Sequence, residues 1–426
     1  MSKFQIILLG VFALFIVVAV FIFSFARGSG SKNATVMVWG SISSYDFNQV
    51  LGNAGIDDEE GLTIRYEEKS LESIESDFTE ALATGVGPDL IVLPLEKLWK
   101  NRNKLVVIPY KSISERDFQN TFVEEGELLL GAEGVYALPL TLDPMVLYYN
   151  RDHLSRAGMA KPLAFWDEIY TASLKLTERD GAGNITKSVM ALGEARNIPH
   201  AKSVLSLLLL QAGTPITSLT SQGLTSALRD SFNLPTTPGE SALDFYTQFS
   251  NPAKPYYSWN RSLLSADTHF ISGDTAYYLG FASELRILKG KNPTLNLGVA
   301  SVPQSRVAGR STTYGKMQVV AVSRATKNTT ASLSAILKLI SAKTAYEFSK
   351  QLLLPPPRRD LLSQKSEDAV LSVFYDSALQ ARGWLDPEDT ASALIFREMI
   401  ESITSGRART SEAISQADKE LEALTK

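Results

Sequence analysis

Short apolar segments of strand type alternate with amphipathic helical segments from residue 34 onward, and this alternation is the strongest constraint on the fold. The runs ATVMVWG, LTIRYEE and GPDLIVLP are typical of strands, the last of a buried strand that follows a Gly-Pro turn. Between the second and third runs, residues 70–85 place Ile74, Phe78 and Leu82 at helical spacing and end on a glycine. This order predicts a mostly parallel sheet with helices on its faces, an α/β fold.

The composition excludes several classes of function. The chain has 426 residues, a formal net charge of −4, and no cysteine. No thiol nucleophile, cysteine-ligated metal or iron–sulfur cluster is therefore available. Only His153, His200 and His269 are present, which is poor material for a metal site or a Ser-His-Asp triad. We expect no metal, no cofactor and no catalytic residue, and the acidic balance argues against nucleic acid as a partner.

The N-terminal segment is long and apolar enough to lie in a lipid bilayer. Residues 4–26 carry no charge, and at 1.5 Å per residue they span about 35 Å as a helix. We expect residues 1–27 to be a transmembrane anchor or signal-anchor, followed by a spacer over residues 28–34, with the folded part on the extracytoplasmic side of the cell membrane. Ser24-Phe25-Ala26 resembles a signal-peptide cleavage site, so cleavage is the open alternative.

One strand-like stretch, residues 134–158, contains residues that a core strand should not carry. Pro139, Asp143 and Pro144 interrupt two apolar runs. Three interpretations are open for Asp143: a catalytic acid, a ligand-binding group, or a bend where the chain passes from one domain to another.

An ordered series of segments resembles the extracellular solute-binding proteins of ABC importers, in the carbohydrate-binding subgroup typified by maltose-binding protein. The resemblance spans most of residues 35–360, and each segment alone is weak. The segments that carry it are GPDLIVLP (87–94), YALPLTLDPMVLYYNRDHLSRAG (136–158), FWDEIYTASLKLT (165–177), FISGDTAYYLGFASEL (270–285), LGVASVP (297–303), YGKMQVVAVS (314–323) and PPPRRD (355–360).

The resemblance implies a two-lobed, periplasmic-binding-protein-like α/β fold in which the chain crosses between the lobes three times. The two prolines beside Asp143 would end regular strand pairing at the first crossing, and the lobes would close around a ligand by hinge motion. The implied crossings lie near residues 141–144, 280–282 and 318–323, the implied lobe one is 35–141 plus 282–318, and the implied lobe two is 144–280 plus 323–426.

The resemblance also implies a binding site between the lobes. Sugar sites combine aromatic faces, which cover C–H patches, with carboxylates and amides, which bind hydroxyl groups. Asp143 matches a hinge acid of the subgroup, and Trp259 with Asn260 is the expected stacking and hydrogen-bonding pair. Each candidate also has a structural interpretation as a turn, cap or core residue. Asn197, His200 and Met317 are further residues that could face the cleft, and Trp166 is expected to be structural. The candidate ligand-binding residues are Trp39, Ser41, Ser43, Glu96, Lys97, Asp143, Trp259, Asn260, Phe281, Ser283, Glu284 and Tyr314.

The function that the resemblance implies is capture of a small polar solute, of carbohydrate type, and its delivery to an ABC permease by a protein tethered to the bilayer through residues 4–26. The loop GSISSYDF lacks the acidic residue and lysine of maltose binders, so maltose itself is not the expected solute. The protein is not expected to be an enzyme. The alternatives are a ligand sensor on the same fold and an extracytoplasmic glycoside hydrolase.

Overall fold

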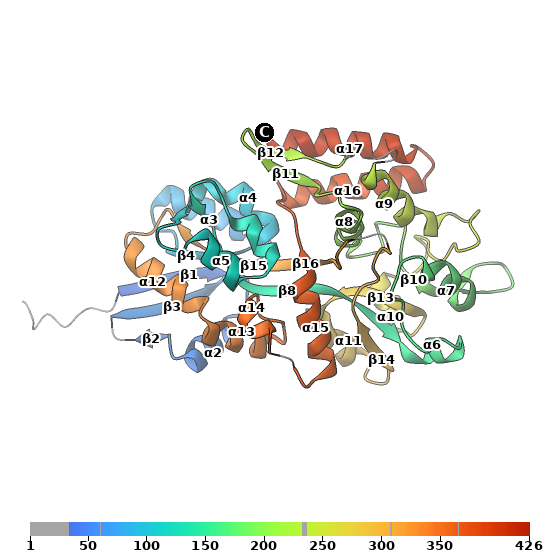
Figure 1. The fold of residues 1–426 in the computed structure, drawn as a ribbon, viewed down its shortest axis with the longest axis horizontal. Coiled ribbons are helices and arrows are strands. Elements are labelled where there is room, and N and C mark those ends of the chain that lie inside the picture. The colour runs from blue at the N-terminus through green and yellow to red at the C-terminus, as the bar shows by residue number, and fades with distance from the viewer. Residues whose placement is uncertain (1–33, 60, 232–236, 307–308, 365) are drawn as a thin grey trace, which may run out of the picture.

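The computed structural model describes residues 34–59, 61–231, 237–306, 309–364 and 366–426 (Figure 1). The predicted membrane anchor at residues 4–26 lies outside the described residues. Within the described ranges, no helix combines the length and the apolar character needed to cross a bilayer.

The strands of the main sheet follow the order β2-β3-β1-β4-β15-β8-β13-β10-β9, and β5, β14 and β16 pair at its sides. β1 pairs in parallel with β3 and β4, whereas β15 and β8 pair antiparallel with each other. Two further two-stranded antiparallel sheets pair β6 with β7 and β11 with β12. The bounds are β1 Ala34–Gly40, β2 Asp58–Glu59, β3 Leu62–Glu68, β4 Leu90–Pro94, β5 Leu105–Val106, β6 Ile108–Pro109, β7 Gly134–Val135, β8 Leu138–Asn150, β9 Glu178–Arg179, β10 Ile185–Met190, β11 Thr217–Thr220, β12 Gly223–Ser226, β13 Thr275–Phe281, β14 Leu297–Ala300, β15 Thr313–Ser323 and β16 Ala381–Arg382.

Helices cover the sheet on both faces, which confirms the predicted α/β class. In Figure 1, α3 and α4 lie on one side of β1, β3 and β4, and α2, α12 and α13 lie on the other. The bounds are α2 Ser44–Ala54, α3 Ile74–Thr84, α4 Leu98–Asn101, α5 Glu115–Thr121, α6 Arg151–Arg156, α7 Glu168–Leu176, α8 Ala201–Ala212, α9 Pro238–Thr247, α10 Ala266–Ile271, α11 Leu285–Lys291, α12 Thr329–Leu339, α13 Ala342–Leu352, α14 Arg359–Leu362, α15 Ala369–Gln380, α16 Asp389–Thr404 and α17 Thr410–Thr425.

Two separate apolar cores lie on either side of a single point in β8. The first core contains β1, β3 and β4 and includes Leu142, whereas the second core begins at Met145. The same division occurs in β15, where Tyr314 packs in the second core and Met317 in the first. β8 and β15 therefore pass from one core to the other side by side, paired with each other.

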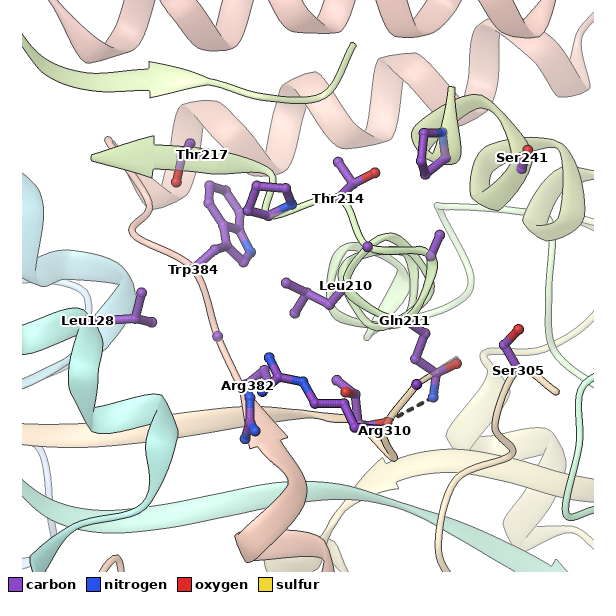
Figure 2. Close-up of a pocket in the computed structure, with 17 residues that line it drawn as sticks. Leu128, Leu210, Gln211, Thr214, Thr217, Ser241, Ser305, Arg310, Arg382 and Trp384 are labelled. Atoms are coloured by element: carbon purple, nitrogen blue, oxygen red, sulfur yellow. Dashed lines mark hydrogen bonds between the residues drawn. The ribbon is translucent and has the colours of Figure 1, made fainter. Parts of the chain in front are cut away.

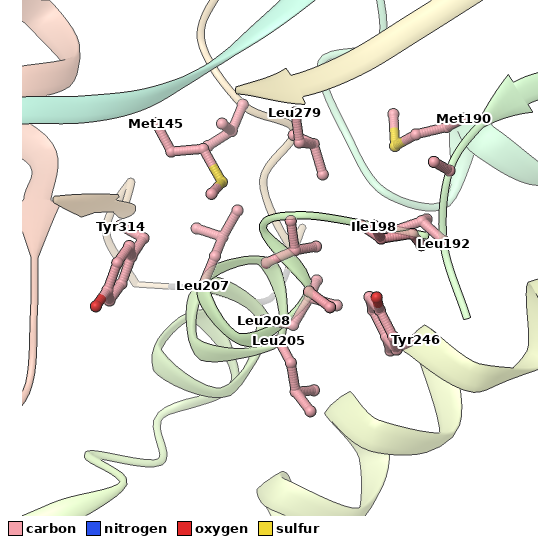
Figure 3. Packing of buried hydrophobic residues seen from close by; sticks show 14 of the residues in the cluster. Met145, Met190, Leu192, Ile198, Leu205, Leu207, Leu208, Tyr246, Leu279 and Tyr314 are labelled. Carbon is pink, nitrogen blue, oxygen red and sulfur yellow. The ribbon is translucent and has the colours of Figure 1, made fainter. Parts of the chain in front are cut away.

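The second core is built around α8. This helix is buried on nearly all sides, with Leu205, Leu207 and Leu209 fully enclosed. Figure 3 shows Leu205 and Leu207 among Met145, Tyr246 and other members of this core. Trp166 is also structural, as expected, because its indole N–H donates to Gln211 Oε1 at 2.6 Å and the residue is 6% exposed.

The prolines of β8 do not end the strand. Pro139 pairs with Val319 and Pro144 with Gly315, so both prolines lie within β8, contrary to the prediction, although the register of the pairing shifts between Gln318 and Val319, next to Pro139. The pairing of β8 with β13 and β14 begins only at Met145. Over its first half β8 therefore has β15 as its one strand neighbour, and such an edge position tolerates the missing N–H of proline.

The packing of two segments differs from the lobe assignments that the resemblance implied. Ala282, Leu288 and Val302 pack in the second core, although residues 282–318 were expected in lobe one. Ala335 and Phe348 pack in the first core, although residues 323–426 were expected in lobe two. The antiparallel pairing explains the second difference: β8 leaves the first core, so β15 must run back into it and carry α12 and α13 there. β13 ends opposite Met145, and the chain turns back into the second core.

A buried carboxylic acid packs against the strands that join the two cores. Glu125, in the short helix Glu124–Leu129, is 1% exposed, and neither of its carboxyl oxygens has a hydrogen-bond partner among the described residues. Burial raises its pKa to about 8, with Glu96 adding to the rise and Arg382 opposing it. A Cβ at Gly315 would lie 1.9 Å from Glu125 Oε2, and one at Gly383 would lie 3.0 Å from Oε1. β15 and the segment directly after β16 therefore each carry a glycine next to the Glu125 side chain.

We predict that Gly315→Ala lowers the free energy of unfolding by about 1–3 kcal/mol, because the enclosed Glu125 side chain has no free space to enter. Gly290→Ala, in α11, is the matched control: no atom lies within 4 Å of its added Cβ, and alanine favours the helix. Chemical denaturation of both variants measures the difference. Equal stabilities for the two variants would contradict the close packing at Gly315.

Candidate functional site

A polar cavity lies where the chain passes between the two cores. Its volume is about 360 Å³. Asp143 on β8 and Lys316 on β15 contribute its floor, directly opposite each other in the strand register. Four of the predicted site residues line this cavity together: Asp143, Phe281, Ser283 and Glu284.

Asp143 is held at the floor of the cavity by hydrogen bonds from Ser283. Its Oδ1 accepts the backbone N–H of Ser283 at 3.0 Å. Burial raises the pKa of the Asp143 carboxyl to about 6, although the hydrogen bonds from Ser283 and the nearby Lys316 ammonium oppose the rise. The group is therefore mostly ionised at neutral pH and can accept hydrogen bonds from a hydroxyl group of a ligand.

Glu284 is fixed by three donors. Its carboxylate contacts His200 Nε2 at 2.7 Å and accepts from the Tyr278 hydroxyl at 2.6 Å and the Phe281 N–H at 2.8 Å. Burial alone would raise the pKa of Glu284, but the hydrogen bond from His200 and the other two donors hold it below its ordinary value. His200 itself lines the cavity, as its position before α8 suggested. Glu284 is thus a pre-oriented anion in the cavity wall.

Lys316 is a cavity residue that sequence reasoning missed. It lies inside YGKMQVVAVS, a stretch that reads as a buried strand. Its ammonium lies 4.1 Å from the centre of the Phe281 ring, so this buried ring has a cation on one face. The signal was present in the sequence: Lys316, like Asp143, is a charged residue within an apolar strand that crosses between the cores.

The candidates at the end of β1 and in the loop after it do not line this cavity: Trp39, Ser41 and Ser43. Lys69 Nζ lies 4.0 Å from the centre of the Trp39 ring, so this indole already has a cation on its face. Ser43 is the N-cap of α2, where its hydroxyl accepts the N–H of Asp46. Ser41 is half-buried in the loop between β1 and α2.

Two other candidates, Tyr314 on β15 and Glu96 after β4, form a neighbouring polar pair. The Tyr314 hydroxyl donates to Glu96 Oε1 at 3.4 Å, and Tyr314 is 3% exposed. Burial raises the pKa of Glu96, while the charge of Lys316 opposes the rise. Lys97 turns away and forms an ion pair with Glu75. Met317, a further candidate, is in the first core.

The expectation of a stacking surface at Trp259 is wrong. Trp259 is fully buried, its Nε1–H donates to Asn197 Oδ1 at 3.1 Å, and its ring meets His269 edge-on at 5.2 Å. Asn260 holds the same loop, because its amide donates to the Tyr257 hydroxyl and its Oδ1 accepts from Ser262. The aromatic loop packs on its own neighbours and presents no free indole face to a ligand.

Within the described ranges, no group of three or more histidine, aspartate and glutamate side chains is arranged to hold a metal ion. The side chains that line the cavity, among them Asp143, Lys316 and Glu284, offer hydrogen-bonding and ionic groups to a ligand.

We predict that Trp259→Ala lowers the free energy of unfolding by about 3–5 kcal/mol, because it removes a fully buried indole and leaves a cavity. Trp39→Ala is the comparison, since this half-buried indole covers less of the core and should cost less. Urea denaturation of the two variants measures both values. Nearly unchanged stability of Trp259→Ala would contradict the structural role of this residue.

A family model described as bacterial extracellular solute-binding protein matches residues 53–370. This match confirms the predicted resemblance and the prediction of a binding protein rather than an enzyme. A Brucella abortus (strain 2308) protein named as a binding protein is 24% identical over 122 residues, which are 28% of this chain and 30% of that protein. The chain thus matches about a third of the length of its curated relatives.

Solved structures share the fold over nearly the whole chain at low identity. A cyclo/maltodextrin-binding protein complexed with maltotetraose superimposes with a TM-score of 0.75 at 16% identity, covering 93% of this chain and 98% of the other. A cyclic alpha-maltosyl-1,6-maltose binding protein from Arthrobacter globiformis gives 0.75 at 15% identity, with 92% and 99% covered. CpMnBP1 with mannobiose bound gives 0.66 at 17% identity, with 92% and 100% covered.

Proposed function

The chain belongs to the bacterial extracellular solute-binding protein family, and from this premise we propose that it captures a small polar solute of carbohydrate type and delivers it to an ABC permease. The observation that carries the proposal is the cavity at the crossing strands, where Asp143, Lys316 and Glu284 converge. The proteins of similar fold include binders of maltotetraose and mannobiose, which favours a carbohydrate as the solute.

The groups in the cavity suit a ligand with several hydroxyl groups. Asp143 and Glu284 accept hydrogen bonds, Lys316 donates them, and the exposed Ser283 hydroxyl does both. The Phe281 and Trp39 rings are each covered by a lysine. We therefore propose that polar contacts contribute more than aromatic stacking to affinity, and that the site residues are Asp143, His200, Phe281, Ser283, Glu284 and Lys316.

We propose that the two cores are the centres of two lobes, and that the lobes move about β8 and β15 when a solute binds. The cavity adjoins both crossing strands and the segment after β13. A solute that contacts residues of both lobes stabilises the closed arrangement by its differential affinity for that arrangement. The lobe boundaries then follow the cores, at residues 142–145 and 314–317.

We further propose that the protein is held at the outer face of the cell membrane by residues 4–26. The support is the uncharged apolar sequence of this segment and the extracellular setting of the family. With no cysteine in the chain, a lipid attached to an N-terminal cysteine is not an available anchor.

A panel of mono- and oligosaccharides, polyols and peptides tests the proposed function. A solute present at 100 times its dissociation constant should stabilise the protein by about 2.7 kcal/mol, which is measured as a rise in melting temperature. Lys316→Gln should abolish the rise, whereas Arg306→Gln, far from the cavity in its ion pair with Asp167, should not. No stabilisation by any member of the panel would contradict the proposal.

The affinity for a neutral solute should fall as pH falls through the pKa of Asp143, about 6. Protonation removes the charged acceptor, so binding at pH 5 should be about tenfold weaker than at pH 7. The pKa of Glu284 lies below its ordinary value, so Glu284 stays ionised over this range. Calorimetric titration of the wild type and of Asp143→Asn at several pH values measures the effect. An identical pH profile in the two proteins would refute the role of Asp143.

A further inference from the structure

A second and larger cavity lies beside the last segment that joins the two cores. This segment runs from Ala381, in the first core, to Trp384, in the second. The cavity has a volume of about 890 Å³ and is lined by the C-terminal end of α8, the loop before β15 and this joining segment (Figure 2). It shares no lining residue with the cavity at Asp143.

Two buried polar atoms in the wall of the large cavity lack partners among the described residues. Arg382 donates to the Ala381 carbonyl and forms an ion pair with Glu124, but its buried Nε–H has no acceptor. Thr214 is fully buried, and its Oγ1 also has no hydrogen-bond partner. Leaving such groups buried and unpaired costs free energy. A ligand that offers them an acceptor would recover part of this cost.

The charges around Arg382 leave one positive charge uncompensated. Arg310 and Arg382 both pair with the single carboxylate of Glu124. Glu125, the other acidic residue beside Arg382, is largely uncharged at neutral pH because burial raises its pKa to about 8. The amide of Gln211 is already occupied by the carbonyls of Pro303 and Thr312. The groups of the wall that remain free to bind a ligand are therefore positively charged hydrogen-bond donors.

The rest of the wall is partly apolar. Leu128, Leu210 and Trp384 contribute apolar side chains, and Thr217, Ser241 and Ser305 contribute hydroxyl groups (Figure 2). The volume is within the range of about 300–1,000 Å³ that small-molecule sites occupy. Such a wall fits an apolar body of one or two rings.

We propose that this cavity is a second ligand site, distinct from the solute cavity, and that it binds a small organic monoanion with an apolar body. The anionic group, a carboxylate, binds the guanidinium groups of Arg382 and Arg310, and the rings pack against Leu128, Leu210 and Trp384. Because residues from the sides of both cores line the cavity, a bound ligand contacts residues on both sides of the segments that join the cores.

Isothermal titration of the full chain with naphthalene-1-carboxylate tests this site, with naphthalene-1-methanol as the uncharged probe of the same shape. We expect saturable binding of the carboxylate and at least tenfold weaker binding of the alcohol. The side chain of Arg310 is 63% exposed, so its loss should not disturb folding. Arg310→Gln should weaken binding of the carboxylate several-fold. Arg382→Gln should remove the preference for the carboxylate.

Two control variants locate the bound probe. Arg306→Gln removes a neighbouring arginine that pairs with Asp167 and Glu168 outside the cavity, and should leave binding unchanged. Lys316→Gln removes the cation of the solute cavity, and should also leave binding unchanged. The proposal is overturned by absence of saturable binding, by equal affinity for carboxylate and alcohol, by wild-type affinity in Arg310→Gln, or by loss of binding in Lys316→Gln.

Discussion

The antiparallel pairing of β8 with β15 is the constraint on which the rest of the structure depends. It is the one ladder that continues from the first core into the second, from Leu138–Val320 to Pro144–Gly315. Since the two strands run in opposite directions, β8 delivers the chain to the second core and β15 returns it to the first. The assignment of α12 and α13 to the first core follows from this direction alone. The hinge that we propose between the two lobes would act at this ladder.

The proposed solute cavity is a consequence of the same pairing. A strand inside a core cannot carry a charge without a partner, but at the point between the cores the side chains of β8 and β15 meet solvent. Asp143 and Lys316 occupy paired positions there, one with a raised pKa and the other over the Phe281 ring. On the opposite side of β15, Gly315 makes room for Glu125. Charged groups and glycines thus occur where the two cores separate.

The sequence predicted the α/β class, the family, and a shared site for Asp143, Phe281, Ser283 and Glu284, which line one cavity. These predictions rest on local signals: hydrophobic period, glycine stops, and a charge within an apolar strand. The prediction of a stacking role for Trp259 was wrong. An exposed aromatic loop and a loop that folds back on its own hydrogen bonds have the same composition, so the sequence does not distinguish them. Lys316 was missed, and the segments that carry Leu288 and Phe348 were expected in the other lobe, because strand direction and neighbours are properties of the assembled sheet.

The central claim is that a solute bound at the crossing strands brings two lobes together, and a distance measurement tests it most directly. The chain has no cysteine, so Tyr45→Cys on α2 and Lys289→Cys on α11 can be spin-labelled without further changes. Tyr45 is 70% exposed and Lys289 is also exposed, and their helices pack in different cores. With a saturating amount of a solute that stabilises the protein, the distance between the labels should shorten. A distance distribution that is the same with and without the solute would contradict the claim.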